Sequence, residues 1–339
     1  MNASELKIAV FGAGAMGTVL GALLTEGGLQ VDLITRNKAH IEGLRKKGAT
    51  IVCVADNTEK TIPVRALFPD EISESYDIIF LMTKQRENER ILQGLLPYLK
   101  PDGVVCTTQN GLPEPSVAKI VGEQRTYGAA TSFGANFLGE GRVALTSKLE
   151  AMTIEVGGYC NDNAKNGLLR EVLSCVRKEN FVKTTENLAG ARWAKLAINA
   201  AFSGLSVVTG MTFGEVARKR KTRKIALGVL RECVAVANAA GITLASLQGH
   251  DMQKLLCGKW GYFLLPFAMR KHKNLVSGML KDVQAGKKCE IDFVDGVVVK
   301  EGERLGVATP LCAQIVEIVH GIENGLYEIS YKNADFFAL

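Results

Sequence analysis

The sequence predicts an α/β protein in which a doubly wound parallel sheet is followed by a mainly α-helical region. Apolar, strand-like runs alternate with helical periods over the first half of the chain, and strand patterns almost vanish after about residue 188. At 339 residues the chain is long for one hydrophobic core. We therefore expect two domains, at residues 1–187 and 188–339.

The elements of the first half follow one another in the order that a parallel sheet with helices on both faces requires. Strands are expected at residues 7–11, 30–35, 77–82, 103–107 and 126–132, and helices after the first four of them at 15–26, 38–46, 85–99 and 114–121. Residues 50–54 and 142–156 are expected to add partly antiparallel strands, followed by a helix at 163–178 and a last strand at 181–184.

The second half shows long helical periods of apolar residues. Helices are expected at residues 191–208, 223–240, 246–255, 266–285, 291–305 and 310–324.

Composition excludes several classes of protein. Apolar residues make up 47% of the chain and charged residues 22%, as in soluble globular proteins. The uncharged stretch 8–25 loosely imitates a signal peptide or a membrane helix, but four glycines interrupt it. The eight cysteines form no C-x-x-C pair and no zinc-type spacing with histidine. We therefore expect no metal, no membrane contact and a reducing, cytoplasmic location.

The net charge of +6 has one local source. Six Lys and Arg residues lie within 218–224, and without them the chain is neutral. A nucleic-acid site would show interleaved aromatic residues or a second basic stripe, and neither accompanies this run. We interpret it as a solvated surface and expect no nucleic-acid partner.

A glycine-rich turn follows the first strand, in the pattern G-x-G-x-x-G. Gly12 permits the tight turn, Gly14 lets the backbone approach a pyrophosphate, and Gly17 lets the next helix pack close to the strand. That helix opens at Ala15 and Met16, and its unpaired N–H groups and positive dipole end favour an anion. The order strand, turn, helix and strand predicts a Rossmann-type, dinucleotide-binding first domain.

Three residues near the ends of later strands are candidate cofactor contacts. Arg36 ends the second strand, where NAD-type sites usually carry Asp or Glu, and a guanidinium suits the 2′-phosphate of NADP. Lys84 follows the carboxyl end of another strand at the same edge and is placed to reach a phosphate or the adenine. Asn110 follows the next strand, with an amide for the nicotinamide side or the substrate. We therefore expect NADPH/NADP+ rather than NAD; the plainer interpretation of these residues is loop polarity.

One helix carries an unusual polar stripe. No charge occurs from residue 196 to 214, and on an ideal helix Lys195, Asn199, Phe202, Ser203 and Ser206 fall within one arc of about 100°. A lysine at a helix start often extends to water, which is the plainer interpretation. The segment 277–292 contains carboxylates that are candidates to pair with this lysine.

Together these motifs resemble the ketopantoate reductase (2-dehydropantoate 2-reductase) family over nearly the whole chain. The matching features are residues 12–17, Arg36, Lys84, 109–111, 195–199, Met279, Asp282, Gly286 and 290–292. The resemblance implies NADPH-dependent reduction of a small 2-oxo acid, 2-dehydropantoate, to pantoate, a step of pantothenate and coenzyme A biosynthesis. It also implies Lys195 as proton donor, Glu290 as its acidic partner, Asn110, Asn199 and Ser203 as substrate contacts, and a homodimer. Residues 188–339 would be the substrate and catalytic domain.

Three positions depart from the family pattern, all on the substrate side. Ser203 and Phe213 stand where the family commonly has asparagine, and Gly278 replaces the second serine of a Ser-Ser-Met triplet. Two alternatives therefore stay open. One is a reductase of a different 2-oxo acid or an imine on the same scaffold, and the other is a non-catalytic NADP(H)-sensing regulator.

Overall fold

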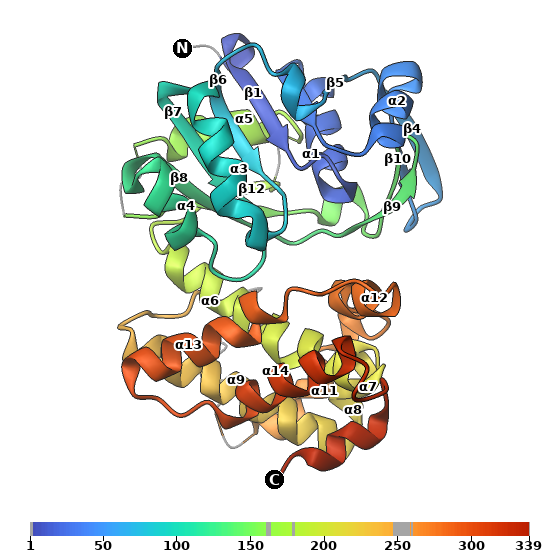
Figure 1. The fold of residues 1–339 in the computed structure, drawn as a ribbon, viewed down its shortest axis with the longest axis vertical. Helices are drawn as coiled ribbons and strands as arrows, with labels where there is room; N and C mark the ends of the chain where they lie inside the picture. The colour runs from blue at the N-terminus through green and yellow to red at the C-terminus, as the bar shows by residue number, and fades with distance from the viewer. Residues whose placement is uncertain (1–2, 161–163, 178–179, 247–257, 259, 339) are drawn as a thin grey trace. The chain divides into compact units, whose positions relative to one another are not determined.

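The computed structural model describes residues 3–160, 164–177, 180–246, 258 and 260–338. The chain divides into two compact units (Figure 1). The first comprises Met1–Gln109 and Pro113–Leu188, and the second comprises Asn110–Leu112 and Ala189–Leu339. The short segment Asn110–Leu112 thus belongs to the second unit, although the residues before and after it in the sequence belong to the first.

The first unit is built on an eight-stranded sheet in the order β12-β11-β8-β7-β6-β1-β2-β5. Its strands are β1 (Lys7–Phe11), β2 (Gln30–Ile34), β5 (Arg65–Leu67), β6 (Tyr76–Leu81), β7 (Leu99–Thr107), β8 (Thr126–Thr131), β11 (Ile154–Gly158) and β12 (Val182–Thr184). All neighbours are parallel except β8 and β11. The chain runs outward from β1 through β2 on one side and through β6 on the other, so the strand order reverses at the β1–β6 pair.

Helices cover both faces of this sheet, because alternate residues of each strand point to opposite sides. Ile8 and Val10 pack into one apolar cluster, with α1 (Ala15–Glu26), α2 (Lys38–Lys47) and α5 (Asn166–Ser174). Ala9 and Phe11 pack into another, with α3 (Asn88–Leu95) and α4 (Glu114–Val121). The result is a three-layer arrangement with helices on both faces of the sheet.

A second, four-stranded sheet lies against α1, in the order β4-β3-β10-β9. Its strands are β3 (Ala49–Cys53), β4 (Thr58–Ile62), β9 (Ala135–Gly139) and β10 (Arg142–Leu145). Because α1 is enclosed between two sheets, every residue from Gly17 to Leu24 is buried. This explains the absence of charge in residues 8–25 without a membrane.

The second unit is helical. Its helices are α6 (Leu188–Asn199), α7 (Leu205–Thr209), α8 (Phe213–Arg218), α9 (Arg220–Ala239), α11 (Gly261–Ala268), α12 (Gly278–Gln284), α13 (Asp295–Leu305) and α14 (Pro310–Glu323). Helix α9 buries Ile225, Val229, Cys233 and Val236, spaced three or four residues apart, so one stripe of it faces a single apolar core. A π-helical turn, Ala200–Gly204, separates α6 from α7.

The predicted fold class is confirmed, and so are most of the predicted elements. Helices α1 and α4 have the expected bounds. The expected strand 142–156 is wrong as one element, because a 3₁₀ turn, Leu149–Ala151, separates β10 from β11 and the two join different sheets. The expected helix 85–99 is α3 flanked by 3₁₀ turns.

The expected single helix 266–285 is also wrong. Helix α11 ends at Ala268 and α12 begins at Gly278. The Ser277 hydroxyl accepts a hydrogen bond from Met279 N, which starts a new helix there. The helix expected at 246–255 lies, apart from Ser246, outside the described residues.

Candidate active site

The glycine turn after β1 has the geometry that its sequence predicts. Gly12 has φ +100°, and a Cβ there would lie 2.7 Å from Met82 C and Thr83 N. A Cβ at Gly14 would meet only Gly12 O, at 4.0 Å. Helix α1 begins at Ala15 without a side-chain cap and without an acidic residue in its first turn. The turn therefore leaves room beside Gly14 and a positive helix end facing it.

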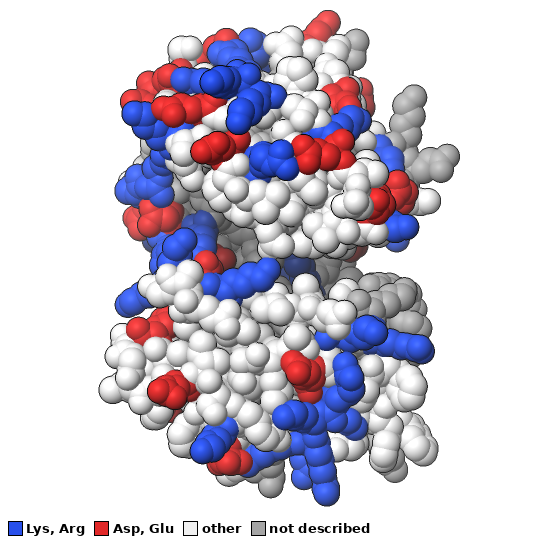
Figure 2. Space-filling view, turned by 90° about the vertical axis from the view of Figure 1, so that its right-hand side faces the viewer, with Lys and Arg blue, Asp and Glu red and all other residues white. Residues whose placement is uncertain are grey.

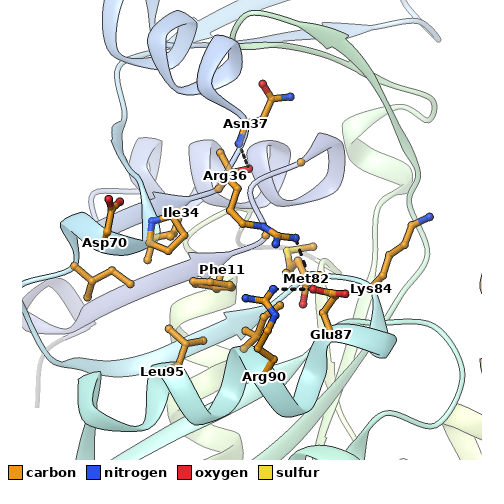
Figure 3. A pocket seen from close by; sticks show the side chains of 18 of the residues that line it. Phe11, Ile34, Arg36, Asn37, Asp70, Met82, Lys84, Glu87, Arg90 and Leu95 are labelled. Atoms are coloured by element: carbon orange, nitrogen blue, oxygen red, sulfur yellow. Dashed lines mark hydrogen bonds and ion pairs between the residues drawn. The ribbon is translucent and has the colours of Figure 1, made fainter. Parts of the chain in front are cut away.

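A cavity of about 740 Å³ opens at the carboxyl ends of β1, β2 and β6. This is the edge at which the strand order reverses, where open α/β sheets bind ligands. Its floor is apolar, formed by Phe11, Ile34, Ile72, Ile91 and Leu95. Figure 3 shows charged side chains around this floor, contributed by the end of β2 and by the segment that leads into α3. An apolar floor with a charged rim suits the adenosine half of a dinucleotide.

Arg36 lines this cavity, as the sequence predicts for a cofactor-binding residue, and it meets an acidic partner there. Its Nη2 atom lies 3.9 Å from Oε2 of Glu87. Arg90 donates a hydrogen bond of 2.7 Å to the same oxygen. This bond, with the charges of Arg36 and Arg86, holds the pKa of the Glu87 carboxyl below its ordinary value. Sequence reasoning missed these partners, because their positions a few residues beyond β6 carry no pattern of their own.

Lys84 also lines the cavity and is half-buried. In Figure 3 its side chain extends away from the group formed by Arg36, Glu87 and Arg90. Its carbonyl oxygen accepts a hydrogen bond from Glu87 N, which fixes the turn that leads into α3. Lys84 and Glu87 therefore belong to one rigid corner of the cavity wall.

Gln109 holds that corner from the neighbouring strand. Its Nε2 donates to Thr83 O and to Asn88 Oδ1, both at 2.7 Å, and its Oε1 accepts from Thr107 Oγ1 at 2.9 Å. The side chain is buried, so these bonds are shielded from water. The Gln109 amide thus has a structural role, which explains why a glutamine directly precedes Asn110.

Asn110, a predicted contact for cofactor and substrate, is exposed and groups with the helical unit. Gly111 follows with φ +78°, a conformation that favours glycine. Leu112 then packs against the apolar core of the helical unit. Gln109 is therefore the last residue of the first unit before the three residues that belong to the helical unit.

Lys195 and Asn199 lie one helical turn apart on α6, so they share a face, and both are partly exposed. The predicted polar stripe does not continue regularly, because the π-helical turn begins at Ala200 and changes the helical period. Phe202 is fully buried, and Ser206 is buried with its hydroxyl donating to Met211 O at 2.6 Å. The regular arc therefore ends after Asn199, and a role of this stripe in the site stays a prediction.

The remaining predicted residues of the helical unit lie on separate elements. Ser203 lies in the π-helical turn and is buried. Glu290 is half-buried and directly precedes the 3₁₀ turn Ile291–Phe293. Phe213 begins α8, and its buried ring packs 5.4 Å from that of Phe202. Gly278 is exposed, and a Cβ there would meet nothing within 4 Å.

The basic run 218–224 makes contacts within the helical unit. Lys221 pairs with Asp335 at 2.6 Å, and Lys219 and Arg223 lie over aromatic rings. Figure 2 shows one face of the protein, on which Lys and Arg side chains gather over part of the helical unit and both signs of charge intermix on the first unit. Among the described residues, no three His, Cys, Asp or Glu side chains are grouped to hold a metal ion. No described helix has the length and hydropathy to span a membrane.

Known solved structures share this architecture. A 2-dehydropantoate 2-reductase from Geobacter metallireducens GS-15 superimposes with a TM-score of 0.80 at 25% identity, covering 93% of this chain and 99% of that one. D-mandelate dehydrogenase in complex with NADH and anilino(oxo)acetate gives a TM-score of 0.82 at 24% identity, covering 95% and 99%. The second likeness concerns the fold alone.

Sequence comparison agrees with the fold. A 2-dehydropantoate 2-reductase from Archaeoglobus fulgidus is 26% identical over 325 residues, 94% of this chain and 99% of the relative. One from Pyrococcus horikoshii is 27% identical over 311 residues, 90% and 94%. The protein-family model "Ketopantoate reductase PanE/ApbA" matches residues 8–158, and the family model of its C-terminal part matches residues 187–323. The chain therefore belongs to the ketopantoate reductase PanE/ApbA family of oxidoreductases.

Proposed function

We propose that the chain reduces 2-dehydropantoate to pantoate with NADPH, as a step of pantothenate and coenzyme A biosynthesis. The observation that carries the cofactor half is the cavity beside Gly14, where an apolar floor meets the cations Arg36 and Arg90. The substrate half rests on membership of the family and on relatives of that activity that match over almost their whole length.

The residues of the first unit fit NADPH. Room beside Gly14 and the uncapped start of α1, at Ala15, Met16 and Gly17, suit a pyrophosphate. Arg36, two residues beyond β2, suits a 2′-phosphate, because a guanidinium matches phosphate oxygens with two parallel hydrogen bonds. We include Lys84 and Asn110 among the cofactor contacts. The reduced nicotinamide supplies the hydride when it is bound.

Lys195 supplies the proton in this proposal. As hydride reaches the ketone carbon, negative charge develops on the carbonyl oxygen, and the Lys195 ammonium stabilises that charge and donates a proton from Nζ. The Glu290 carboxylate orients the lysine or binds a substrate hydroxyl. Asn110, Asn199 and Ser203 hold the polar groups of the 2-oxo acid.

A second candidate is the reduction of a different 2-oxo acid or of an imine. The observation that favours it is the buried Phe213 ring, which stands where the family commonly has a polar amide and offers no hydrogen bond to a substrate hydroxyl. A third, a nucleotide-sensing regulator without catalysis, requires NADPH to bind without being oxidised. We further propose that the protein is cytoplasmic and forms a homodimer. Light scattering measures the molar mass in solution and tests the dimer.

The test is the oxidation of NADPH against a panel of 2-oxo acids and imines. We expect turnover with 2-dehydropantoate. Binding of NADPH without oxidation by any member of the panel would favour the regulator, and turnover of another class alone would favour the second candidate.

A further inference from the structure

A single carboxylate oxygen is shared by two guanidinium groups at the rim of the cavity. Oε2 of Glu87 lies 2.7 Å from Nη2 of Arg90 and 3.9 Å from Nη2 of Arg36. Figure 3 shows both guanidinium groups directed at this carboxylate, one from the end of β2 and one from α3. An acidic group bridging two arginines occupies the position that an anionic ligand would take between them.

Hydrogen bonds hold the backbone next to Arg36 and at Glu87, which places both residues at the same rim of the cavity. The Asn37 side chain caps α2 by accepting from His40 N at 3.1 Å, which leaves the adjacent Arg36 at the cavity rim. Glu87 ends the 3₁₀ turn before α3, yet its side chain makes no capping bond to that helix. It is turned to the arginines instead.

Arg90 stands at an unfavourable place for a cation. It is in the first turn of α3, where the helix dipole favours negative charge. Its side chain is 63% exposed, so packing does not hold it there. A cation in this place raises the local positive potential next to Arg36, which is a cost to the helix and a gain for an anionic ligand.

We infer that Arg90 is a second cation for the 2′-phosphate of the cofactor and that Glu87 sets how strongly this phosphate is preferred. This inference rests on the proposed use of NADPH and extends it. Glu87 neutralises part of the positive charge of Arg36 and Arg90, which weakens phosphate binding. The same carboxylate offers an acceptor to a ribose 2′-hydroxyl, so it favours the cofactor without the phosphate.

The experiment compares two small probes that differ only by the 2′-phosphate, adenosine 2′,5′-bisphosphate and adenosine 5′-monophosphate. Calorimetry gives the dissociation constant of each for the full-length protein, and their ratio isolates the phosphate contact without substrate or turnover. We expect Glu87→Gln to raise the preference for the bisphosphate about five- to tenfold and Arg90→Gln to lower it by a similar factor.

The matched control is the pair Glu59 and Arg142, an exposed ion pair of 3.0 Å in the same unit but outside the cavity. Glu59→Gln should leave the ratio unchanged, which excludes a general effect of net charge. An unchanged or lower ratio in Glu87→Gln would overturn the role of Glu87, and an unchanged ratio in Arg90→Gln would overturn that of Arg90. If the unaltered protein shows no preference for the bisphosphate, the NADPH proposal fails, but a preference created by Glu87→Gln would still support this inference.

Discussion

Gly17 lies against the carbonyl oxygen of Gly12, so closely that a Cβ at Gly17 would be only 2.4 Å from that oxygen. Gly14 has no such neighbour, since its nearest atom would be 4.0 Å from an added Cβ. The two glycines of one motif therefore have different reasons to be glycine. Gly17 allows α1 to pack on β1, and Gly14 keeps space for a ligand.

This difference predicts that alanine at the two positions has separable effects. Gly17→Ala should destabilise the first unit by about 1–3 kcal/mol, because backbone must shift to relieve the overlap. Gly14→Ala should keep the melting temperature close to that of the parent but weaken nucleotide binding at least tenfold, an effect of about 1.4 kcal/mol. Thermal unfolding and nucleotide titration of both variants measure this, and a Gly14→Ala variant with unchanged affinity would remove Gly14 from the site.

Arg36 should determine cofactor choice. We expect Arg36→Ala to weaken NADPH binding by about 1.5–3 kcal/mol and NADH binding much less, because only NADPH carries the 2′-phosphate. Titration of both cofactors measures the difference. Equal losses for the two would show that Arg36 does not contact that phosphate.

Lys195 should act in the chemical step. Lys195→Ala is expected to lower kcat by about 10²–10⁴-fold with the fold intact, the usual effect of removing a positioned acid. Lys221→Ala is the control, since Lys221 lies in the same unit and pairs with Asp335. Glu290→Ala should lower kcat/KM. Near-normal kcat in Lys195→Ala would place the proton donor elsewhere, and unchanged kcat/KM in Glu290→Ala would remove that residue from the site.

His40 should make the first unit sensitive to acid. Its Nδ1 accepts from Gly141 N at 3.0 Å, its Nε2 lies 2.8 Å from Thr18 Oγ1, and burial lowers the pKa of the imidazole to about 4. Because the folded pKa is below the ordinary 6.5, the unfolded chain binds more protons between these values. Stability is therefore full above about pH 6.5 and falls as the pH drops towards 4, by up to about 3 kcal/mol.

Denaturant unfolding at several pH values tests the role of His40. His40→Gln should unfold with much less pH dependence over this window. His320→Gln is the control, because His320 is partly exposed beside Asp292 in the other unit and should leave the acid sensitivity in place. If His40→Gln loses as much stability at acid pH as the parent protein does, another titrating group causes that loss.

Local patterns predicted the first unit well, because its elements carry their own signals. Helix α1 lies between a glycine turn and a Gly27-Gly28 pair, and β2 ends at Ile34, two residues before Arg36. The second sheet was only partly predicted. Strand β10 pairs with β3 over a separation of about ninety residues, as in Arg142 with Thr50, and no local period reports such a pairing.

The candidate site shows the same division. Arg36 was predictable because its distance from the glycine turn is fixed by one strand–helix–strand unit. Arg90 and Glu87 were not, because they reach the cavity only through the packing of α3. Arg192 and Asp295 are fully buried ionisable residues of the helical unit, a rare placement that no local pattern reports. The π-helical turn after Asn199 has no sequence signal that period analysis detects.

The central claim is the identity of the substrate, and the most direct test is kcat/KM with NADPH for 2-dehydropantoate and for 2-oxoisovalerate, which lacks the terminal hydroxyl. A site built to bind a hydroxyl discriminates strongly against an analogue without it, and an apolar pocket does not. Since Ser203, Phe213 and Gly278 supply fewer polar groups than the family pattern, we expect turnover of 2-dehydropantoate with reduced selectivity over 2-oxoisovalerate. No turnover of 2-dehydropantoate, together with good turnover of an unrelated 2-oxo acid or an imine, would contradict the account.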